Sequence, residues 1–238
     1  MSPLFSVIIP TWNEAQDLPD CLQRLSEQNC PDFEVIVCDA GSHDQTLSIA
    51  HDFGCKILNG VQGRSLQMNQ GAKLATGEIL LFLHADTKLS KEALQSIREL
   101  MFRFPKVPAG AFYVEIDAPG WLFWCITKAS NLRSRLTEYP YGDQGIFVKR
   151  SIFQENGGFP EVRLFEEVLF FRKIRALGRI GLIRKPQIQI SARRWIEEGI
   201  GYTVLRNTLL TFGFYLGVNP NSLAQFYQPR KPHPSFET

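Results

Sequence analysis

The chain lacks the features that mark several common classes of protein. None of its 238 residues belongs to an apolar stretch of about 18, so we expect no membrane-spanning helix. The five cysteines form no C-x-x-C pair, which indicates neither a zinc site nor a disulfide framework and favours reduced thiols in a cytoplasmic protein. The net charge of +2 is too small to indicate a nucleic-acid-binding surface. The N-terminus carries no basic segment, so we expect no signal peptide.

The first half of the chain alternates short apolar runs with helical patterns, and 44% hydrophobic residues suffice for a substantial core. Asn13 with Gln16, and Ser42 with Gln45, have the spacing of capping boxes at two helix starts. The order predicts a parallel, Rossmann-like sheet with right-handed crossovers. No G-x-G-x-x-G follows the first strand and no Walker motif occurs, so a dinucleotide or P-loop site has no support. The predicted strands are 5–9, 33–38, 55–58 and 79–83, and the predicted helices end near residues 28, 53 and 75.

The second half is less regular and contains no linker rich in proline, glycine or serine. We therefore expect one α/β domain, residues 1–227, with a mostly parallel central sheet flanked by helices and further helices at its C-terminal end. Residues 228–238, with three prolines, are predicted to form a loose tail. The predicted helices of this half are 90–104, 119–136, 166–177 and 196–214, and the predicted strands are 110–116, 145–148 and 181–190.

Asp86 ends the most informative segment. The five apolar residues Ile79–Leu83 are typical of a strand buried on both faces of a sheet, and His84, Ala85 and Asp86 follow directly. Open α/β sheets bind ligands beyond the carboxyl ends of their strands, and a carboxylate there can hold Mg²⁺ or Mn²⁺ against phosphate. The alternative is an aspartate that caps the next helix.

Two more strand ends carry polar candidates. Asp39 follows the strand 33–38 and could accept hydrogen bonds from the N–H groups of a base, or simply bond its own turn. Arg64 starts the helix after the third strand, where a guanidinium suits a diphosphate, although a solvated surface arginine is the alternative. Asn69 and Gly71 on that helix could give a polar contact and a close approach of helix to sheet, or belong to the core.

Glu166 and Glu167 begin a predicted helix, whose dipole favours negative charge there. Because neighbouring residues do not share a helix face, one could point into a cleft as a general base while the other caps the helix. Asp143 and Gln144 form a polar loop that could shape a pocket. Arg194 and Trp195, with Arg193, follow the last strand and could bind phosphate or stack on a sugar.

The ordered set of segments resembles family 2 glycosyltransferases of the GT-A fold, in particular a small bacterial-type branch. The resemblance spans about residues 5–226. The segments are S-V-I-I-P-T-W-N-E (6–14), V-I-V-C-D-A-G-S-H-D-Q-T (35–46), G-R-S-L-Q-M-N-Q-G-A (63–72), A-T-G-E-I-L-L-F-L-H-A-D-T (75–87), Y-G-D-Q-G-I-F (141–147), G-G-F-P (157–160), L-F-E-E-V (164–168) and S-A-R-R-W (191–195).

The resemblance implies inverting transfer of a sugar from a nucleotide-diphosphate donor, a UDP-sugar, with Mn²⁺ or Mg²⁺. Residues 1–90 would be the nucleotide-binding half and 91–227 the acceptor-binding half. It places Asp39 on the nucleotide base, Asp86 on the metal, and Glu167, beside Glu166, in the role of catalytic base. Residue chemistry and resemblance together give these donor-binding candidates: Pro10, Thr11, Trp12, Glu14, Asp39, Arg64, Asn69, His84, Ala85, Asp143, Gln144, Arg194 and Trp195.

Three positions depart from the family pattern. The D-x-D motif reads His84-Ala85-Asp86, so its first acid is missing and we expect weak metal dependence. Glu167 stands where aspartate is usual, which shifts the carboxylate by one methylene. S-A-R-R-W only partly matches the Q-x-x-R-W motif of processive synthases, so we expect a single transfer.

The acceptor is open at this stage. Trp121, Phe123 and Trp124, with the aromatic segment 209–218, could form a wall for an apolar or lipid-linked acceptor, contact the inner face of a membrane, or fill the core. We expect no nucleic-acid partner. Two other functions remain: a nucleotide-sugar-binding module with little turnover, and a nucleotidyltransferase, which would need a basic glycine-rich loop after the first strand.

Overall fold

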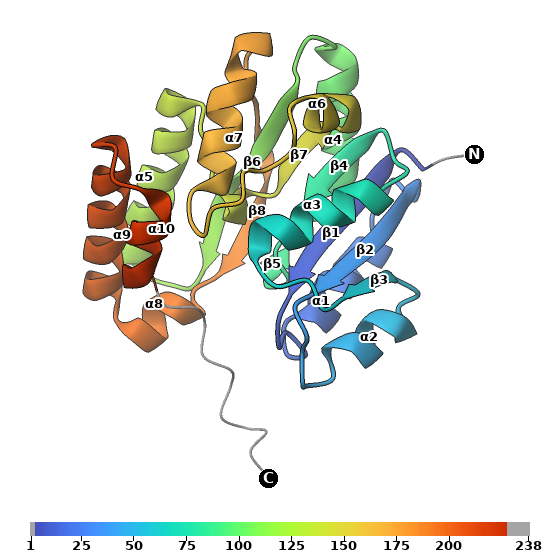
Figure 1. Ribbon diagram of the computed structural model, residues 1–238, viewed down its shortest axis with the longest axis horizontal. Coiled ribbons are helices and arrows are strands. Elements are labelled where there is room, and N and C mark those ends of the chain that lie inside the picture. The colour runs from blue at the N-terminus through green and yellow to red at the C-terminus, as the bar shows by residue number, and fades with distance from the viewer. Residues whose placement is uncertain (1–2, 228–238) are drawn as a thin grey trace.

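The computed structural model describes residues 3–227 as one α/β domain around an eight-stranded sheet of order β3-β2-β1-β4-β7-β6-β8-β5 (Figure 1). The strands are β1 (Phe5–Thr11), β2 (Phe33–Asp39), β3 (Lys56–Asn59), β4 (Ile79–Phe82), β5 (Thr87–Lys88), β6 (Ala109–Asp117), β7 (Ile146–Lys149) and β8 (Gly181–Ser191). The helices are α1 (Leu18–Ser26), α2 (Thr46–Asp52), α3 (Arg64–Leu74), α4 (Ala93–Arg103), α5 (Trp121–Thr137), α6 (Arg150–Glu155), α7 (Glu166–Ile174), α8 (Arg193–Glu198), α9 (Ile200–Tyr215) and α10 (Pro220–Leu223).

The first four strands form the parallel part of the sheet that the sequence predicts. β1 lies between β2 and β4, with Thr11 opposite Asp39 and Ile8 opposite Phe82. All four residues of β4 are buried, as expected for a strand covered on both faces. The carboxyl ends of β2 and β4 therefore flank the same end of β1, and Asp39 and the segment leading to Asp86 lie at one edge of the sheet.

The second half closes the sheet with antiparallel strands. β7 runs antiparallel to β4 and to β6, whereas β6 and β8 are parallel, with a register shift between Phe112 and Val114. Two apolar layers cover the sheet. One contains α1 and α4, and the other contains α3, α6 and α7.

Gly71 lets α3 approach the sheet closely, as expected. A Cβ atom at this position would lie 2.6 Å from Ile8 Cγ2 and 2.7 Å from Cys38 Sγ. Both neighbours belong to buried strands, so any larger residue would push the helix outward.

Several local expectations are wrong. Asn13 and Ser42 cap no helix: Asn13 has φ +54° and accepts a hydrogen bond from the His43 amide (3.0 Å), while the Ser42 hydroxyl donates to Asp39 (2.5 Å). The predicted helix 196–214 is two helices, α8 and α9, because Gly199 adopts φ +89° between them. The sequence also gave no sign of α6, α10 or the short β5. The tail 228–238 lies outside the described residues, and within them no helix is both long and apolar enough to cross a membrane.

Glu34 on β2 ties three parts of the parallel sheet together. Its carboxylate accepts hydrogen bonds from the Ser6 hydroxyl (2.6 Å), the Lys56 ammonium (2.5 Å) and both the amide and hydroxyl of Thr76 (2.7 and 2.8 Å). Burial alone would raise the pKa of Glu34, but these bonds outweigh it and lower the pKa to about 2. The ionised carboxylate thus stabilises the fold.

We expect Glu34→Gln to lower the free energy of unfolding at neutral pH by about 2 kcal/mol, because bonds to a charged acceptor are lost. The contribution is present above the unfolded pKa of about 4.3 and is lost as the pH falls towards the folded value. Urea unfolding of the native protein and of Glu34→Gln, from pH 7 to about pH 3, should show that the difference between their free energies of unfolding becomes smaller. A gap that stays constant across this range would show that the carboxylate charge is not responsible.

Candidate active site

Asp39 is fully buried and is used by its own loop. Its Oδ1 accepts hydrogen bonds from the amides of Gly41 (2.8 Å) and Ser42 (2.7 Å), and its Oδ2 from the hydroxyls of Thr11 (3.0 Å) and Ser42 (2.5 Å). Four donors match the four lone-pair positions of a carboxylate. In this arrangement Asp39 shapes the loops after β1 and β2, the turn alternative raised from sequence, and its contact with a base stays a prediction.

Gln67 on α3 reinforces the same loops and was missed by the sequence analysis. Its buried amide nitrogen donates to the carbonyl of Thr11 (2.9 Å) and to that of Cys38 (2.6 Å). The amide therefore satisfies two carbonyl groups at the ends of adjacent strands. A glutamine within a helix gives no sequence signal for such a role.

The remaining residues of the first loop surround this framework. Pro10 lies opposite Cys38, beyond the last residue of β1 that pairs with β4, so its missing N–H costs no bond to that strand. Trp12 is 43% exposed at the end of the sheet. The Glu14 amide donates to the Thr46 hydroxyl (2.8 Å), which fixes the loop to α2.

Arg64 is the centre of a charged cluster that joins three elements. Its Nε donates to Glu166 Oε1 (2.7 Å), its Nη2 donates to Glu167 Oε1, and its Nη1 lies 3.3 Å from His84 Nε2. The arginine begins α3, the histidine follows β4, and the two glutamates begin α7. Residues about 100 positions apart in the chain thus meet beyond the carboxyl end of β4.

The two glutamates are held in place by the start of α7. Both are almost completely buried, and Phe165 before them has φ +63°, a costly conformation for a residue with a side chain. The Phe165 ring stacks on Phe214 of α9 (4.5 Å between centroids), which holds this backbone in position. The N-terminal end of α7 favours negative charge, and Arg64 supplies the countercharge.

Gly142 leaves the space that the Arg64–Glu167 pair occupies. A Cβ atom there would collide with Glu167 Oε1 and lie 2.7 Å from Arg64 Nη2. The residue belongs to the 3-10 turn Gly142–Gln144, which precedes β7. The polar loop predicted to shape a pocket therefore forms one wall of the charged cluster.

Asp143 brings a third carboxylate to the cluster. Burial raises the pKa of the Asp143 carboxyl. The positive charges of Arg133 and Arg64 lower this pKa in part, whereas the negative charge of Asp86 raises it further. Asp143 Oδ1 and Glu166 Oε2 are buried and have no hydrogen-bond partner among residues 3–227. Buried carboxylate oxygens of this kind are costly unless a cation or donor approaches them, so this cluster is suited to receive a positively charged or hydrogen-bonding group.

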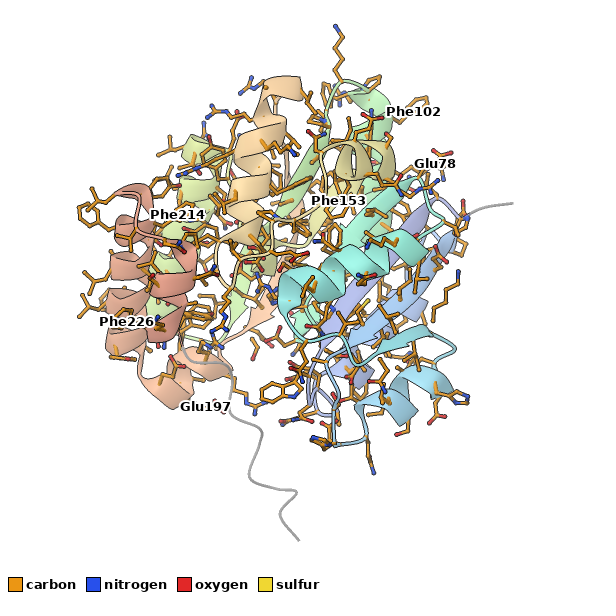
Figure 2. The ribbon with its side chains drawn as sticks, viewed as in Figure 1. Glu78, Phe102, Phe153, Glu197, Phe214 and Phe226 are labelled. Atoms are coloured by element: carbon orange, nitrogen blue, oxygen red, sulfur yellow. The ribbon has the colours of Figure 1, made fainter. Side chains whose placement is uncertain are left out.

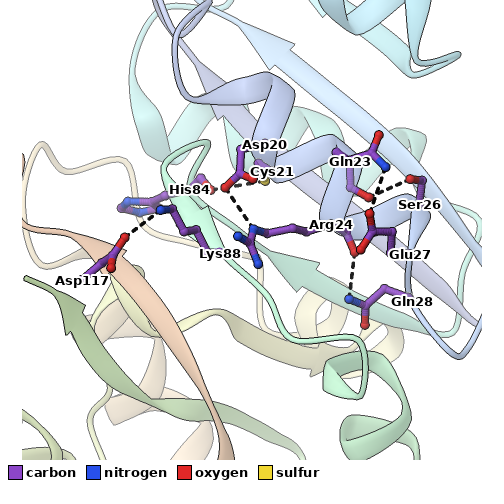
Figure 3. A network of polar contacts seen from close by, with 10 residues as sticks. All are labelled: Asp20, Cys21, Gln23, Arg24, Ser26, Glu27, Gln28, His84, Lys88 and Asp117. Atoms are coloured by element: carbon purple, nitrogen blue, oxygen red, sulfur yellow. Dashed lines mark hydrogen bonds and ion pairs between the residues drawn. The ribbon is translucent and has the colours of Figure 1, made fainter.

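A cleft of about 350 Å³ opens beside Asp86. Its charged lining residues include Lys88, Asp117 and Arg193, and Lys88 donates to Asp117 (2.6 Å), a bond drawn in Figure 3. Figure 3 also shows the Cys21 thiol directed at the backbone of His84, whose carbonyl it contacts at 3.8 Å. The cleft is lined by Asp86 but by neither Asp39 nor the Arg64–Glu167 pair, and Ala85 is buried beside it.

Four predicted residues serve the framework in this structure. Asn69 donates to the Phe159 carbonyl (2.8 Å) and accepts from its amide (2.9 Å). Gln144 is fully buried and bonds Ser134 (2.6 Å) and the Phe112 carbonyl (3.1 Å). Arg194 bonds Tyr227 and lies over its ring, and Trp195 packs against the core. Tyr227 also interacts electrostatically with Arg64, so the Arg194 contact lies beside the Arg64 cluster.

A divalent metal fits this site in one way. Among residues 3–227 no three His, Cys, Asp or Glu side chains could hold a metal by themselves. Mg²⁺ and Mn²⁺ are commonly held by one or two carboxylates together with substrate phosphates, and Asp86 at the cleft provides such a carboxylate. The residues therefore suit a metal shared between Asp86 and a phosphorylated ligand.

Solved structures of glycosyltransferases share this fold. The chain matches a crystal structure of S. aureus TarS 1-349 in complex with UDP-GlcNAc with a TM-score of 0.66 and 23% identity, over 79% of this chain and 58% of that one. A Pyrobaculum calidifontis mannosyltransferase in complex with GDP-Man and Mn²⁺ matches with a TM-score of 0.62 and 23% identity, over 80% and 57%. These likenesses concern the fold.

Residues 6–157 match the family described as glycosyl transferase family 2, and the chain belongs to this family. A PGL/p-HBAD biosynthesis glycosyltransferase of Mycobacterium bovis is 36% identical over 166 residues, which cover 66% of this chain and 64% of that protein. The chain thus spans less than two thirds of this relative's length. The family that the sequence predicted is therefore confirmed.

Proposed function

We propose that the protein transfers one sugar, with inversion and in a single non-processive step, from a UDP-sugar to a hydroxyl acceptor. The observation that carries the proposal is the meeting of Glu167, Glu166 and Arg64 beyond the end of β4, next to the segment of Asp86. A buried carboxylate beside a cation and an acidic strand end provides a base, a phosphate ligand and a metal ligand in one region. UDP-GlcNAc in the complex of TarS supports the choice of donor.

In the proposed reaction Arg64 turns from the glutamates to the donor diphosphate. The Arg64 side chain is 41% exposed, so it can reach a ligand while remaining on α3. This movement frees Glu167, which accepts the proton of the acceptor hydroxyl as that oxygen attacks the anomeric carbon. The C–O bond to the diphosphate breaks as the new C–O bond forms on the opposite face. Arg64 stabilises the charge that develops on the departing diphosphate.

Asp86 would hold Mn²⁺ or Mg²⁺ together with the donor diphosphate, and the bound metal would act as a Lewis acid towards the leaving group. Mn²⁺ in the complex of the mannosyltransferase supports this choice. His84 contacts Arg64, so in the present arrangement it orients the arginine. The base-binding role of Asp39 and the division into residues 1–90 for the donor and 91–227 for the acceptor belong to the same proposal.

The acceptor is proposed to be apolar or lipid-linked and to be met in the cytoplasm, at the inner face of a membrane. Of the aromatic residues that suggested this, Phe123 is buried in the core, whereas Trp121 and Trp124 are mostly exposed. The core interpretation thus holds for Phe123 and not for the two tryptophans. Exposed tryptophans are costly in water and suit an apolar ligand.

A panel of nucleotide sugars with Mn²⁺ tests the proposal. Slow hydrolysis of one donor, with release of UDP, is the expected result, since glycosyltransferases without acceptor can pass the sugar to water. Tight binding of a donor with no hydrolysis and no transfer would favour a binding module instead. Exchange of pyrophosphate into the donor would favour a nucleotidyltransferase.

Gly142→Ala should lower the rate of donor hydrolysis about a hundredfold, because a displacement of about 1 Å at the reacting groups has that effect. The added methyl group meets only the ends of the Glu167 and Arg64 side chains, which can move. The melting temperature should therefore change little. Gly201→Ala is the matched control, since a Cβ atom there meets nothing within 4 Å. Equal rates in the two variants would exclude a functional role for the Arg64–Glu167 geometry.

A further inference from the structure

Two neighbouring helices expose far more apolar surface than the rest of the molecule. On α9 the side chains of Tyr202, Leu205, Leu209, Phe212 and Leu216, the last just past the helix, are 59–69% exposed and recur every three or four residues. On α5, Trp121 and Trp124 are 73% and 61% exposed. A stripe of exposed apolar side chains, with two exposed tryptophans on a neighbouring helix, marks a site of interaction.

The two helices lie at the same end of the molecule. Arg133 of α5 stacks on the Tyr141 ring (3.4 Å to its centroid), and the Tyr141 hydroxyl lies 3.2 Å from the Thr211 hydroxyl of α9. In Figure 1 both helices are on the left, and in Figure 2 Phe214 and Phe226 mark that side while Phe102 lies on the opposite side of the view. We call the exposed side chains of α5 and α9 the α5–α9 face.

The charges of this face have one sign. Neither α5 nor α9 contains an aspartate or glutamate. Lys128 and Arg135 are exposed on α5; Lys128 lies over the Trp124 ring (5.6 Å), and Arg172 of α7 lies beside Tyr215 (5.2 Å). Glu198, which precedes α9, is paired with Arg206 at 2.5 Å. The face therefore offers aromatic and aliphatic side chains with cations and no acid on its two helices.

We propose that the α5–α9 face docks on the surface of a bilayer that contains anionic lipids. Tryptophan and tyrosine with lysine and arginine at their sides are the residues that proteins place at the boundary between headgroups and acyl chains. A second copy of the chain is the alternative suggested by the spacing of the stripe. Two helices that pack through such a stripe usually carry complementary charges beside it. The residues beside the α9 stripe, such as Asn207, Thr208 and Thr211, are uncharged, which argues against a second copy.

Docking on a membrane would bring the candidate active site to an acceptor held there, and only this purpose rests on the proposed function. The experiment uses no donor: the protein is sedimented with vesicles of phosphatidylcholine, with and without phosphatidylglycerol. We expect the protein to bind the anionic vesicles more tightly than the neutral ones. The two affinities should differ by about fivefold for each lysine or arginine that contacts the vesicle surface. Lys128→Gln with Arg135→Gln should reduce this difference.

Leu209→Ser with Phe212→Ser should weaken vesicle binding at least about tenfold, since two exposed apolar side chains no longer enter the bilayer. Phe102→Ser is the control, because Phe102 is 88% exposed on α4, away from this face. Equal vesicle binding by both variants, or no binding by the native protein, would overturn the proposal. A dimer in light scattering that the double variant dissociates would assign the face to a second copy. Donor hydrolysis measured without vesicles reports separately on the proposed function.

Discussion

Replacing Glu167 with glutamine should lower kcat by about 10²–10⁴-fold, the usual contribution of a general base. Glutamine has nearly the same shape and can still accept a hydrogen bond from Arg64, but it cannot take the acceptor's proton. Binding of UDP, measured by calorimetry, should not weaken, because in the proposed reaction Glu167 acts on the acceptor and releases Arg64 when the donor binds. Glu166→Gln should have a smaller effect on kcat, because Glu166 only orients Arg64, by accepting a hydrogen bond from the Arg64 Nε.

Near-native turnover of Glu167→Gln, with donor binding intact, would remove Glu167 from the base role. An equal loss in Glu166→Gln and Glu167→Gln would indicate that both act only by positioning Arg64. The melting temperatures of the two variants serve as the control for folding, since both side chains are buried at the start of α7.

Asp86→Asn should weaken UDP binding in the presence of Mn²⁺ by at least about 10–100-fold, since that range is found even when a group that only orients a metal ligand is lost. An amide oxygen carries no charge and is a poorer ligand for a divalent cation. In EDTA the native protein and the variant should bind UDP about equally. Titration of UDP by calorimetry under both conditions gives the comparison.

Asp117→Asn is the matched control for Asp86→Asn. Asp117 lines the same cleft but is bonded to Lys88, so its loss removes a carboxylate without removing the proposed metal ligand. Equal losses of UDP affinity with Mn²⁺ and with EDTA would show that Asp86 acts on the donor directly or on the fold, and not through a metal.

The parallel part of the sheet could be predicted because each of its strands is a short apolar run followed by a polar residue. Ile79–Phe82 is buried throughout, and the alternation of strands and helices predicts a parallel sheet with right-handed crossovers, although not the order in which β1 to β4 lie in it. Because the carboxyl ends of parallel strands meet at one edge of a sheet, the sequence also predicted that Asp39 and the segment of Asp86 lie at that edge. The strand β7 was predicted as residues 145–148, but its antiparallel pairing with β4, and the short strand β5, could not be derived, because pairing between distant segments leaves no local pattern.

The charged cluster shows both the reach and the limit of sequence reasoning. Arg64, Glu166 and Glu167 were each candidates, but nothing in the sequence indicates that the arginine pairs with both glutamates over about 100 residues. Gln67 and Gly142 gave no chemical signal, since their roles depend on which atoms the fold brings near them. For Asp39, local turn geometry determines the hydrogen bonds, and local sequence alone allows both a turn and a ligand contact.

A crystal structure of the protein with UDP and Mn²⁺ tests the central claim most directly. We predict a diphosphate lying between Asp86 and Arg64, with the metal on the Asp86 carboxylate and Arg64 turned away from Glu167. UDP bound elsewhere, or bound here with the Arg64–Glu167 pair unchanged and no metal at Asp86, would contradict the account.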